Sequence, residues 1–373
     1  MSEKTNVLIV GAGPAGLATA LELARYGIDV RILDKAAAAQ KESRAVAINP
    51  RTLELLDHCG ASARLIAAGV KLKGARIVVG GRVRATFDAT RLTHRYNFML
   101  GLAQSETERL LAVTLAEHGV KVERGVEVTD VEVDGDRPSV RARTPAGETT
   151  IAADWIVGAD GAHSAVRKSL DLDFPGAPYP FHWSLVDVDL AGDAEEDHAE
   201  MRLDWKGPIM VRVPLAPGRH RVISNGPGVL ARLPASWKPG QAHWQSDFSV
   251  SHRMVKERGR GRVWLIGDAA HIHSPAGGRG MNLGIEDGVG FARCIHAKAS
   301  IAGWAERRQH LAARVVRESD AMQRFATAKG FFGRRIAPAL LRSMLRVGPL
   351  HDVLVRAIAG FSDHKPLHFG GDH

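Results

Sequence analysis

Cysteine is scarce in this sequence, and long hydrophobic runs are missing. Only Cys59 and Cys294 occur among the 373 residues, which excludes a disulfide framework and a four-cysteine zinc site. The first apolar run, at residues 7–10, is too short for a signal peptide or a membrane span, and no later stretch reaches spanning length. We therefore expect a cytoplasmic protein with no membrane partner.

Long blocks of like charge are missing as well. The 50 Lys and Arg against 41 Asp and Glu give a net charge of +9 and an isoelectric point near 9.8, but the basic residues are scattered along the chain. Scattered charge is typical of a solubilising surface, so we expect no nucleic-acid partner. A hydrophobic fraction of 45% predicts a globular protein with a substantial core.

A strand, a glycine turn, a helix and a second strand open the chain. The apolar run leads into GAGPAG at 11–16, after which apolar residues recur at helical spacing as far as residue 24. The second strand, at 29–33, ends at Asp34, where a ribose-binding acid belongs. The glycines let backbone N–H groups approach a pyrophosphate, and the helix N-terminus favours its negative charge.

This context predicts a dinucleotide site, with a glycine-rich turn that binds no ligand as the alternative. The turn alone does not distinguish FAD from NAD. The residues assigned to the site are Gly11, Gly13, Pro14, Ala15, Gly16, Asp34 and Lys35.

The stretch GDAAHIHSPAGGRGMNLGIEDG, which starts at Gly267, decides the identity of the dinucleotide. A buried strand delivers Asp268 to the carboxyl end of the sheet, where an acid suits a second polyol such as the ribityl chain of a flavin. Pro275 then turns the chain, and GGRGMN brings nearly bare backbone against a flat ligand. A helix is expected to start near Asn282, and its N-terminal N–H groups would stabilise negative charge on a reduced flavin ring. The predicted ligand is therefore FAD.

Two histidines in the same stretch, His271 and His273, raise the alternative of a metal site. No Glu-x-x-His pattern and no cysteine partner accompany them. We expect them to pack or cap beneath the loop and expect no metal.

Helical periodicity fades between residues 174 and 251, where prolines and short alternating runs predict a mostly antiparallel sheet. Elsewhere, residues 51–60 are expected to form one helix with a glycine stop, and residues 105–119 another with Ser105 as N-cap. The fold class is α/β: a Rossmann-like (GR2-type) FAD-binding domain, an inserted β-sheet substrate domain and C-terminal helices. The FAD-binding domain is assigned residues 1–75, 100–173 and 256–325, the substrate domain 76–99 and 174–255, and the C-terminal helical segment 326–373.

Three spaced signatures, GAGPAG, GADGAHSAVRKSL and GDAAHIHSPAGGRGMNLGIEDG, together resemble one enzyme family. The chain is similar, from residue 6 to about 324, to the class A (single-component) FAD-dependent aromatic hydroxylases, the para-hydroxybenzoate hydroxylase-like flavoprotein monooxygenases. The resemblance implies noncovalent FAD, NADPH or NADH as co-substrate, and O₂. In this family the reduced flavin forms a C4a-hydroperoxide, which hydroxylates an aromatic ring.

The resemblance also implies roles for individual residues. Arg44 would approach the FAD phosphates, Gln104 the ribityl chain and pyrophosphate, and the backbone of Val128 the adenine. Asp160 and Gly161 would touch the linking region of the flavin and help the nicotinamide cofactor to dock. The residues assigned to the ribityl chain and the flavin ring are Gly267, Asp268, Pro275, Gly278, Gly280, Met281 and Asn282. Taken alone, Arg44 could be surface charge, Gln104 could simply precede a helix, and Asp160-Gly161 could be an ordinary turn.

The sequence departs from larger members of the family in ways that bear on the substrate. Residues 225–244 form a short segment, and Arg279 stands where a glutamine is common. The expected reaction is hydroxylation of a phenolic or polycyclic aromatic compound by a monomer or homodimer. No catalytic base is assigned, because the polar residues on the presumed substrate side are more readily structural; they are His94, Tyr96, His182, His220 and Arg221.

Two other functions stay open at this point. The first is a flavin-dependent reductase or dehydrogenase on the same fold, and the second is a flavin-binding protein without catalytic activity. A dependence of product formation on oxygen separates the monooxygenase from the reductase, and any turnover excludes the non-catalytic protein.

Overall fold

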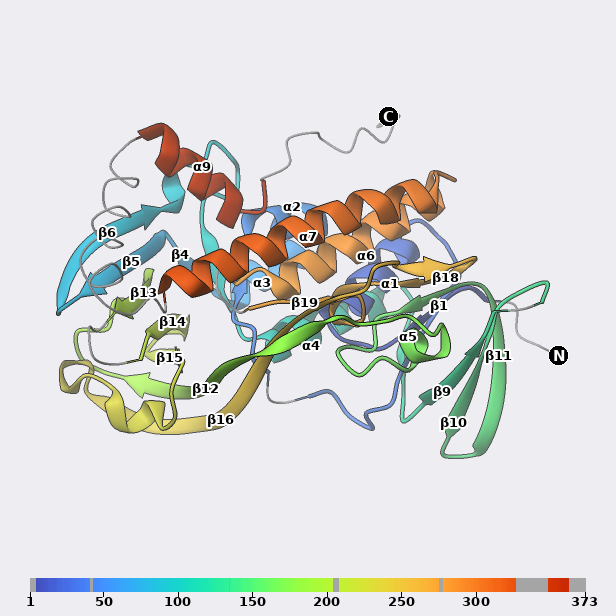
Figure 1. The fold of residues 1–373 in the computed structure, drawn as a ribbon, viewed down its shortest axis with the longest axis horizontal. Helices are drawn as coiled ribbons and strands as arrows, with labels where there is room; N and C mark the ends of the chain where they lie inside the picture. The colour runs from blue at the N-terminus through green and yellow to red at the C-terminus, as the bar shows by residue number, and fades with distance from the viewer. Residues whose placement is uncertain are drawn as a thin grey trace.

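The computed structural model describes residues 5–40, 43–133, 135–203, 208–274, 278–326 and 348–361. Two large sheets occupy opposite ends of the molecule, and a long pair of strands runs between them (Figure 1). None of the helices in the described part of the chain is long and apolar enough to span a membrane.

The first sheet has a parallel centre, with strand order β17-β18-β11-β1-β2-β8. Its strand β1 (Thr5–Val10) pairs in parallel with β2 (Val30–Asp34) on one side and β11 (Gly147–Gly158) on the other. Residues 7–9 are completely buried, as expected of a strand covered on both faces. The other strands of this sheet are β8 (Val122–Arg124), β9 (Glu127–Glu132), β10 (Ser139–Thr144), β17 (Gly259–Arg260) and β18 (Val263–Leu265).

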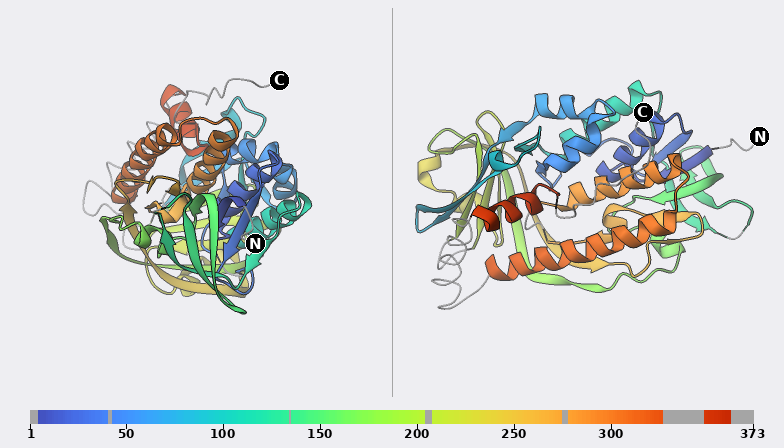
Figure 2. Two further views of the ribbon diagram at one scale, coloured as in Figure 1. Left: turned by 90° about the vertical axis from the view of Figure 1, so that its right-hand side faces the viewer. Right: turned by 90° about the horizontal axis from the view of Figure 1, so that it is seen from above.

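Helices cover one face of the parallel strands. The strands β9 and β10 leave the main path of the sheet, where β10 pairs with the first half of β11, and they cover the other face. Helices α1 (Pro14–Arg25) and α6 (Gly280–His296) pack so closely that a Cβ on Gly288 would lie 2.0 Å from Oγ1 of Thr19. Helix α7 (Ile301–Ala326) runs alongside α6 (Figure 2). The other helices are α2 (Pro50–Asp57), α3 (Ala61–Ala68), α4 (Gln104–Glu117), α5 (Ala165–Ser169) and α9 (Gly348–Ile358).

The second sheet has the order β19-β16-β12-β15-β14-β13-β5-β6 and is antiparallel except where β13 pairs with β5. Its strands are β5 (Gly74–Val79), β6 (Arg82–Asp88), β12 (Gly176–Leu190), β13 (His198–Leu203), β14 (Met210–Ala216), β15 (Arg219–Ser224), β16 (Pro239–Met254) and β19 (His271–Ile272). A small third sheet consists of β3 (Ala47–Ile48), β7 (Met99–Gly101) and β4 (Val70–Leu72).

One strand pairing brings the second sheet to the loop that follows the first sheet. Arg253 and Met254, at the end of β16, pair with Ile272 and His271 of β19. Because β19 begins shortly after Asp268, the predicted substrate sheet is hydrogen-bonded to the predicted flavin-binding stretch.

The predicted α/β architecture is confirmed, with local corrections. The expected helix at 51–60 is two helices, α2 and α3, because Gly60 adopts a left-handed conformation and starts a second helix. Ser105 is not an N-cap: α4 begins at Gln104, and the N–H of Ser105 donates to Oγ of Ser43 in a neighbouring loop. Helix α6 starts at Gly280, slightly before the expected position. The domain boundaries remain a prediction, and part of the segment 326–373 lies outside the described residues.

Candidate cofactor site

A groove of about 670 Å³ opens at the carboxyl ends of β1 and β2. A volume of this size is ordinary for a small-molecule site, and this end of an open parallel sheet is where ligands bind. Several of the predicted cofactor-binding residues line the groove: Gly11, Gly13, Asp34, Lys35, Val128, Asp160 and Gly161.

The glycines of the first turn have different structural roles. Gly11 has a φ of +103°, and a Cβ on Gly16 would lie 2.0 Å from the carbonyl oxygen of Gly11, so both positions need glycine for packing. A Cβ on Gly13, in contrast, would meet no atom within 4 Å. Gly13 therefore leaves an open approach to the backbone at the start of α1, where Pro14 takes the first helical position.

Asp34 is fixed by the backbone around it. Its carboxylate accepts hydrogen bonds from the N–H of Ala12 at 2.7 Å and from that of Ala36 at 2.8 Å. Arg124 of β8 lies 3.6 Å from the same carboxylate and also lines the groove. The sequence did not point to Arg124, because only the pairing of β2 with β8 brings it to this edge.

Asp160 is engaged in local structure. One carboxylate oxygen accepts from the N–H groups of Ala165 and Val166 and so caps α5, while the other is buried without a hydrogen-bond partner. Burial is the largest influence on this carboxyl and raises its pKa. An unsatisfied buried oxygen at the wall of the groove is suited to a hydrogen-bond donor from a ligand.

Asp268 follows β18, on a turn that begins at Gly267 with a φ of +57°. Solvent reaches the Asp268 side chain, yet protein surrounds it closely enough for burial to raise the pKa of its carboxyl, against the opposing charges of His271 and Arg44. Among the described residues the carboxylate has no hydrogen-bond partner. A carboxylate with no partner among the described residues can accept hydrogen bonds from a polyol.

The turn at Asp268 joins the groove through the start of α1. A Cβ on Gly267 would lie 3.2 Å from Cβ of Ala15, and the same Ala15 methyl lies beneath Gly284 of α6. The predicted pyrophosphate turn and the predicted ribityl turn are thus in contact, as one extended ligand requires.

Gln104 and Arg44 are linked through the loop that contains Ala45. The N–H and the side-chain oxygen of Gln104 exchange hydrogen bonds with the backbone of Ala45, and its Nε2 donates to Glu108 at 2.8 Å. The exposed Arg44 guanidinium lies 5.0 Å from the ring centroid of Phe248 on β16. Gln104 therefore supports the Arg44 loop, and Arg44 faces the substrate sheet.

The N-terminus of α6 is tied to the same loop by Asn282. Its side-chain oxygen accepts from the N–H of Asn49 at 2.9 Å, and its Nδ2 donates to the carbonyls of Ala47 and Gly278. Gly280 and Met281 occupy the first helical turn, so their N–H groups lack partners within the helix. Pro275 lies outside the described residues.

His271 and His273 have protein partners. Nε2 of His271 lies 2.7 Å from the Asp287 carboxylate, and Nδ1 of His273 lies 2.9 Å from the carbonyl of Ser274 and must donate to it. Burial lowers the pKa of His273 to about 4, so this ring is neutral. Both imidazole rings therefore support the loop that follows Asp268.

Several polar residues of the presumed substrate side also have structural partners. The Tyr96 hydroxyl donates to Asp57 at 2.6 Å, and buried His220 lies beside Arg212. Arg221 forms a two-bond ion pair with Asp187 and donates to the carbonyls of Ser43 and Ala45. His94 also has a structural partner, since its Nδ1 accepts from the N–H of Tyr96 at 3.1 Å and its ring lies 3.6 Å from Glu54, whereas His182 is exposed on β12.

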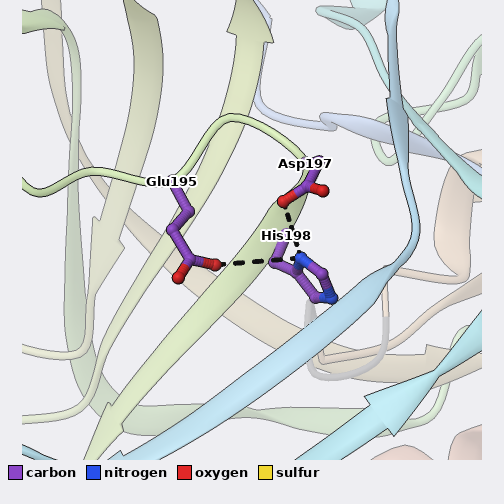
Figure 3. Close-up of side chains that lie close together, drawn as sticks. All are labelled: Glu195, Asp197 and His198. Atoms are coloured by element: carbon purple, nitrogen blue, oxygen red, sulfur yellow. Dashed lines mark hydrogen bonds and ion pairs between the residues drawn. The ribbon is translucent and has the colours of Figure 1, made fainter.

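One group of potential metal ligands occurs among the described residues, at the far end of the second sheet. Glu195, Asp197 and His198 lie within reach of one another (Figure 3). Lys73 lies 2.9 Å from Asp197, and Arg76 pairs with Glu195. These acids are partly neutralised by cations on a solvated surface, which does not favour a cation site.

Comparisons with known proteins identify the family and the fold. The FAD binding domain family matches residues 4–216 and 233–326. The chain is 36% identical over 306 residues to 6-methylpretetramide 4-monooxygenase of Streptomyces rimosus, which covers 77% of this chain and 55% of that protein. The chain thus spans little more than half the length of this curated relative.

Solved structures share the fold. The OxyS anhydrotetracycline hydroxylase of Streptomyces rimosus superposes with a TM-score of 0.79 at 28% identity, over 100% of this chain and 78% of that one. The p-nitrophenol 4-monooxygenase PnpA of Pseudomonas putida DLL-E4 has a TM-score of 0.88 and covers 98% of this chain and 100% of its own; at 24% identity it supports the fold alone.

Proposed function

The chain belongs to the FAD-binding family of para-hydroxybenzoate hydroxylase-like flavoprotein monooxygenases, and from this premise we propose that it hydroxylates a phenolic or polycyclic aromatic compound with NAD(P)H and O₂. FAD is its cofactor. We propose the domain division and the cofactor-binding residues given above, and a monomer or homodimer as the active form.

The observation that carries the proposal is the continuity of the two predicted cofactor turns. Ala15 follows the open backbone at Gly13 and packs against Gly267, and the next residue, Asp268, has no side-chain hydrogen bond among the described residues. The adenosine and pyrophosphate of a dinucleotide need only the first turn. The ribityl chain of FAD lies beyond the pyrophosphate, so FAD would use both turns.

The residues of this chain would divide the work of binding. Gly13 and the N-terminus of α1 would hold the pyrophosphate, and Asp268 the ribityl chain. The free N–H groups at the start of α6 would stabilise negative charge on the flavin ring. Bound FAD would supply electron transfer from NAD(P)H and activation of O₂.

The substrate would bind against the second sheet. Trp183, Trp244 and Phe248 form an aromatic face on β12 and β16, and Phe248 and Trp244 lie over Arg44 and Arg221. Aromatic side chains of this kind pack well against a flat ring. Since β16 is also bonded to β19, this face and the flavin-binding stretch are held together.

The first test is the cofactor itself. The purified protein should carry FAD in about one-to-one ratio, and denaturation should release it because the proposed binding is noncovalent. Release of FMN alone, or no flavin from folded protein reconstituted with FAD, would overturn the proposed site.

The second test is oxygen transfer. The test uses a panel of aromatic compounds. It includes p-nitrophenol as a phenolic probe and anhydrotetracycline as a polycyclic probe, because these compounds appear in the names of the two solved structures above. A substrate should accelerate NAD(P)H oxidation and gain one oxygen atom from ¹⁸O₂. Product oxygen from water, or turnover without O₂, would refute the monooxygenase and favour the reductase.

A further inference from the structure

Asp287, on α6, joins segments that are distant in the sequence. Its carboxylate is completely buried and lies 3.0 Å from Nη1 of Arg258, after β16, and 2.6 Å from Nε of Arg308, on α7. It also accepts from Nε2 of His271 and from the N–H of Gly267. One side chain therefore connects α6, α7, the end of the substrate sheet and the Asp268 turn.

The charges around Asp287 favour its ionised form. Burial alone would raise the pKa of this carboxyl, but Arg258, Arg308 and His271 outweigh burial and hold the pKa well below its usual value. Removing the charge would leave two buried guanidinium groups with less compensation. Asp287 thus places a carboxylate that favours its ionised form behind the turn.

The contact with Gly267 is the step that reaches the cofactor site. Gly267 has a left-handed backbone, and the next residue is Asp268. The N–H of Gly267 lies 3.3 Å from Asp287 Oδ2, and a Cβ on Gly284 would lie 3.2 Å from Cα of Gly267. Asp268 has no side-chain hydrogen bond among the described residues, so its direction depends on this backbone.

We propose that Asp287 is a positioning residue that holds the Gly267 turn so that Asp268 faces the ribityl chain of FAD. This inference rests on the proposed cofactor site. Asp287 would not touch the cofactor, because its carboxylate is hydrogen-bonded to other residues of the protein.

The test separates the two halves of the cofactor. Asp287→Asn keeps the shape and an acceptor oxygen but removes the charge. FAD and ADP are titrated into the apoprotein of the full chain by calorimetry, because ADP tests the Gly13 groove without the ribityl turn. We expect Asp287→Asn to weaken FAD binding by about tenfold, in line with losses from supporting residues at other sites, and ADP binding by less than about twofold.

A double-mutant cycle with Asp268→Ala tests whether Asp287 acts through Asp268. In the Asp268→Ala background, Asp287→Asn should change the FAD dissociation constant by less than about twofold. Glu286→Gln is the matched control. Glu286 is the residue before Asp287, and its carboxylate pairs with the same Arg308 at 3.1 Å. This substitution should leave FAD affinity unchanged.

Equal weakening of FAD and ADP, or an equal effect of Asp287→Asn in both backgrounds, would overturn the positioning role and leave a general role in folding. If Asp287→Asn does not accumulate as folded protein, Arg258→Gln disturbs the same carboxylate from one side and enters the same cycle. FAD binding by the wild-type protein tests the cofactor site separately. If the wild type does not bind FAD, both the proposed function and the role of Asp287 are refuted. If it binds FAD but transfers no oxygen, only the proposed reaction is refuted.

Discussion

The backbone N–H of Asn49 donates to the side-chain oxygen of Asn282 at 2.9 Å, although 233 positions separate them in the sequence. The same Asn282 side chain donates to Ala47 and Gly278. One buried amide therefore holds the loop after Arg44 against the N-terminus of α6.

Asn282→Ala should lower stability, because it leaves the buried N–H of Asn49 without its acceptor and removes the hydrogen bonds to the carbonyls of Ala47 and Gly278. A buried group without a partner costs about 1–3 kcal/mol. Urea unfolding of the apoprotein measures the loss, and exposed Asn97→Ala is the control, expected to unfold like wild type. A wild-type unfolding midpoint for Asn282→Ala would show that the loop does not depend on this amide.

Two glycine substitutions should separate folding from cofactor binding. Gly13→Ala fits the backbone, since Gly13 has φ −75° and ψ −179°, and the methyl group meets no atom. We expect unchanged apoprotein stability and weaker FAD binding, because the methyl group occupies the pyrophosphate approach. Gly16→Ala places a methyl group against the Gly11 carbonyl and should cost about 1–3 kcal/mol of stability.

Thermal unfolding and FAD titration of both variants measure these effects. Wild-type FAD affinity in Gly13→Ala would remove this turn from the cofactor site. Undiminished stability of Gly16→Ala would show that α1 can shift away from the strand.

The glycine turn was predictable because its signals are local. A buried strand, closely spaced glycines and an acid at the end of the next strand specify one βαβ geometry, and the structure contains it at 5–34. The turn that carries Asp268 could be placed for the same reason, because it follows the buried strand β18, while the role of Asp268 in binding stays a prediction.

Residues whose roles depend on distant partners were not predictable. Asp287 stands inside the quoted GIEDG stretch, yet nothing in that stretch indicates that Arg258 and Arg308 converge on it. The parallel pairing of β13 with β5 likewise joins His198 to Gly74 across separate parts of the chain. The start of α4 at Gln104, before Ser105, belongs here too: the backbone N–H of Ser105 donates to Ser43, a residue 62 positions away.

Acid should destabilise the protein partly through His273. Burial lowers its pKa to about 4 from an ordinary 6.5, so between these values the unfolded chain binds more protons than the folded one. Stability should therefore be full above about pH 6.5 and fall as pH decreases toward 4, by up to about 1.4 kcal/mol per pH unit for one group. Buried His220, whose pKa is also lowered to about 4, acts in the same direction.

Urea unfolding of the apoprotein between pH 7 and pH 4.5 tests this. His273→Gln should reduce the dependence on pH, whereas His118→Gln, on an exposed site, should not. An identical pH dependence in wild type and His273→Gln would mean that this ring accepts a proton freely in the folded state.

Asp268→Ala should weaken FAD binding with little effect on the apoprotein fold, because the carboxylate accepts no hydrogen bond from the described residues. Loss of a charge-assisted hydrogen bond costs about 1.5–3 kcal/mol, or one to two orders of magnitude in the dissociation constant. The ionised carboxylate is the better acceptor for ribityl hydroxyls, and burial raises its pKa. FAD affinity should therefore fall as acid protonates Asp268, and this dependence should vanish in Asp268→Asn. Fluorescence titration at several pH values measures both effects, and an unchanged dissociation constant in Asp268→Ala would place the ribityl chain elsewhere.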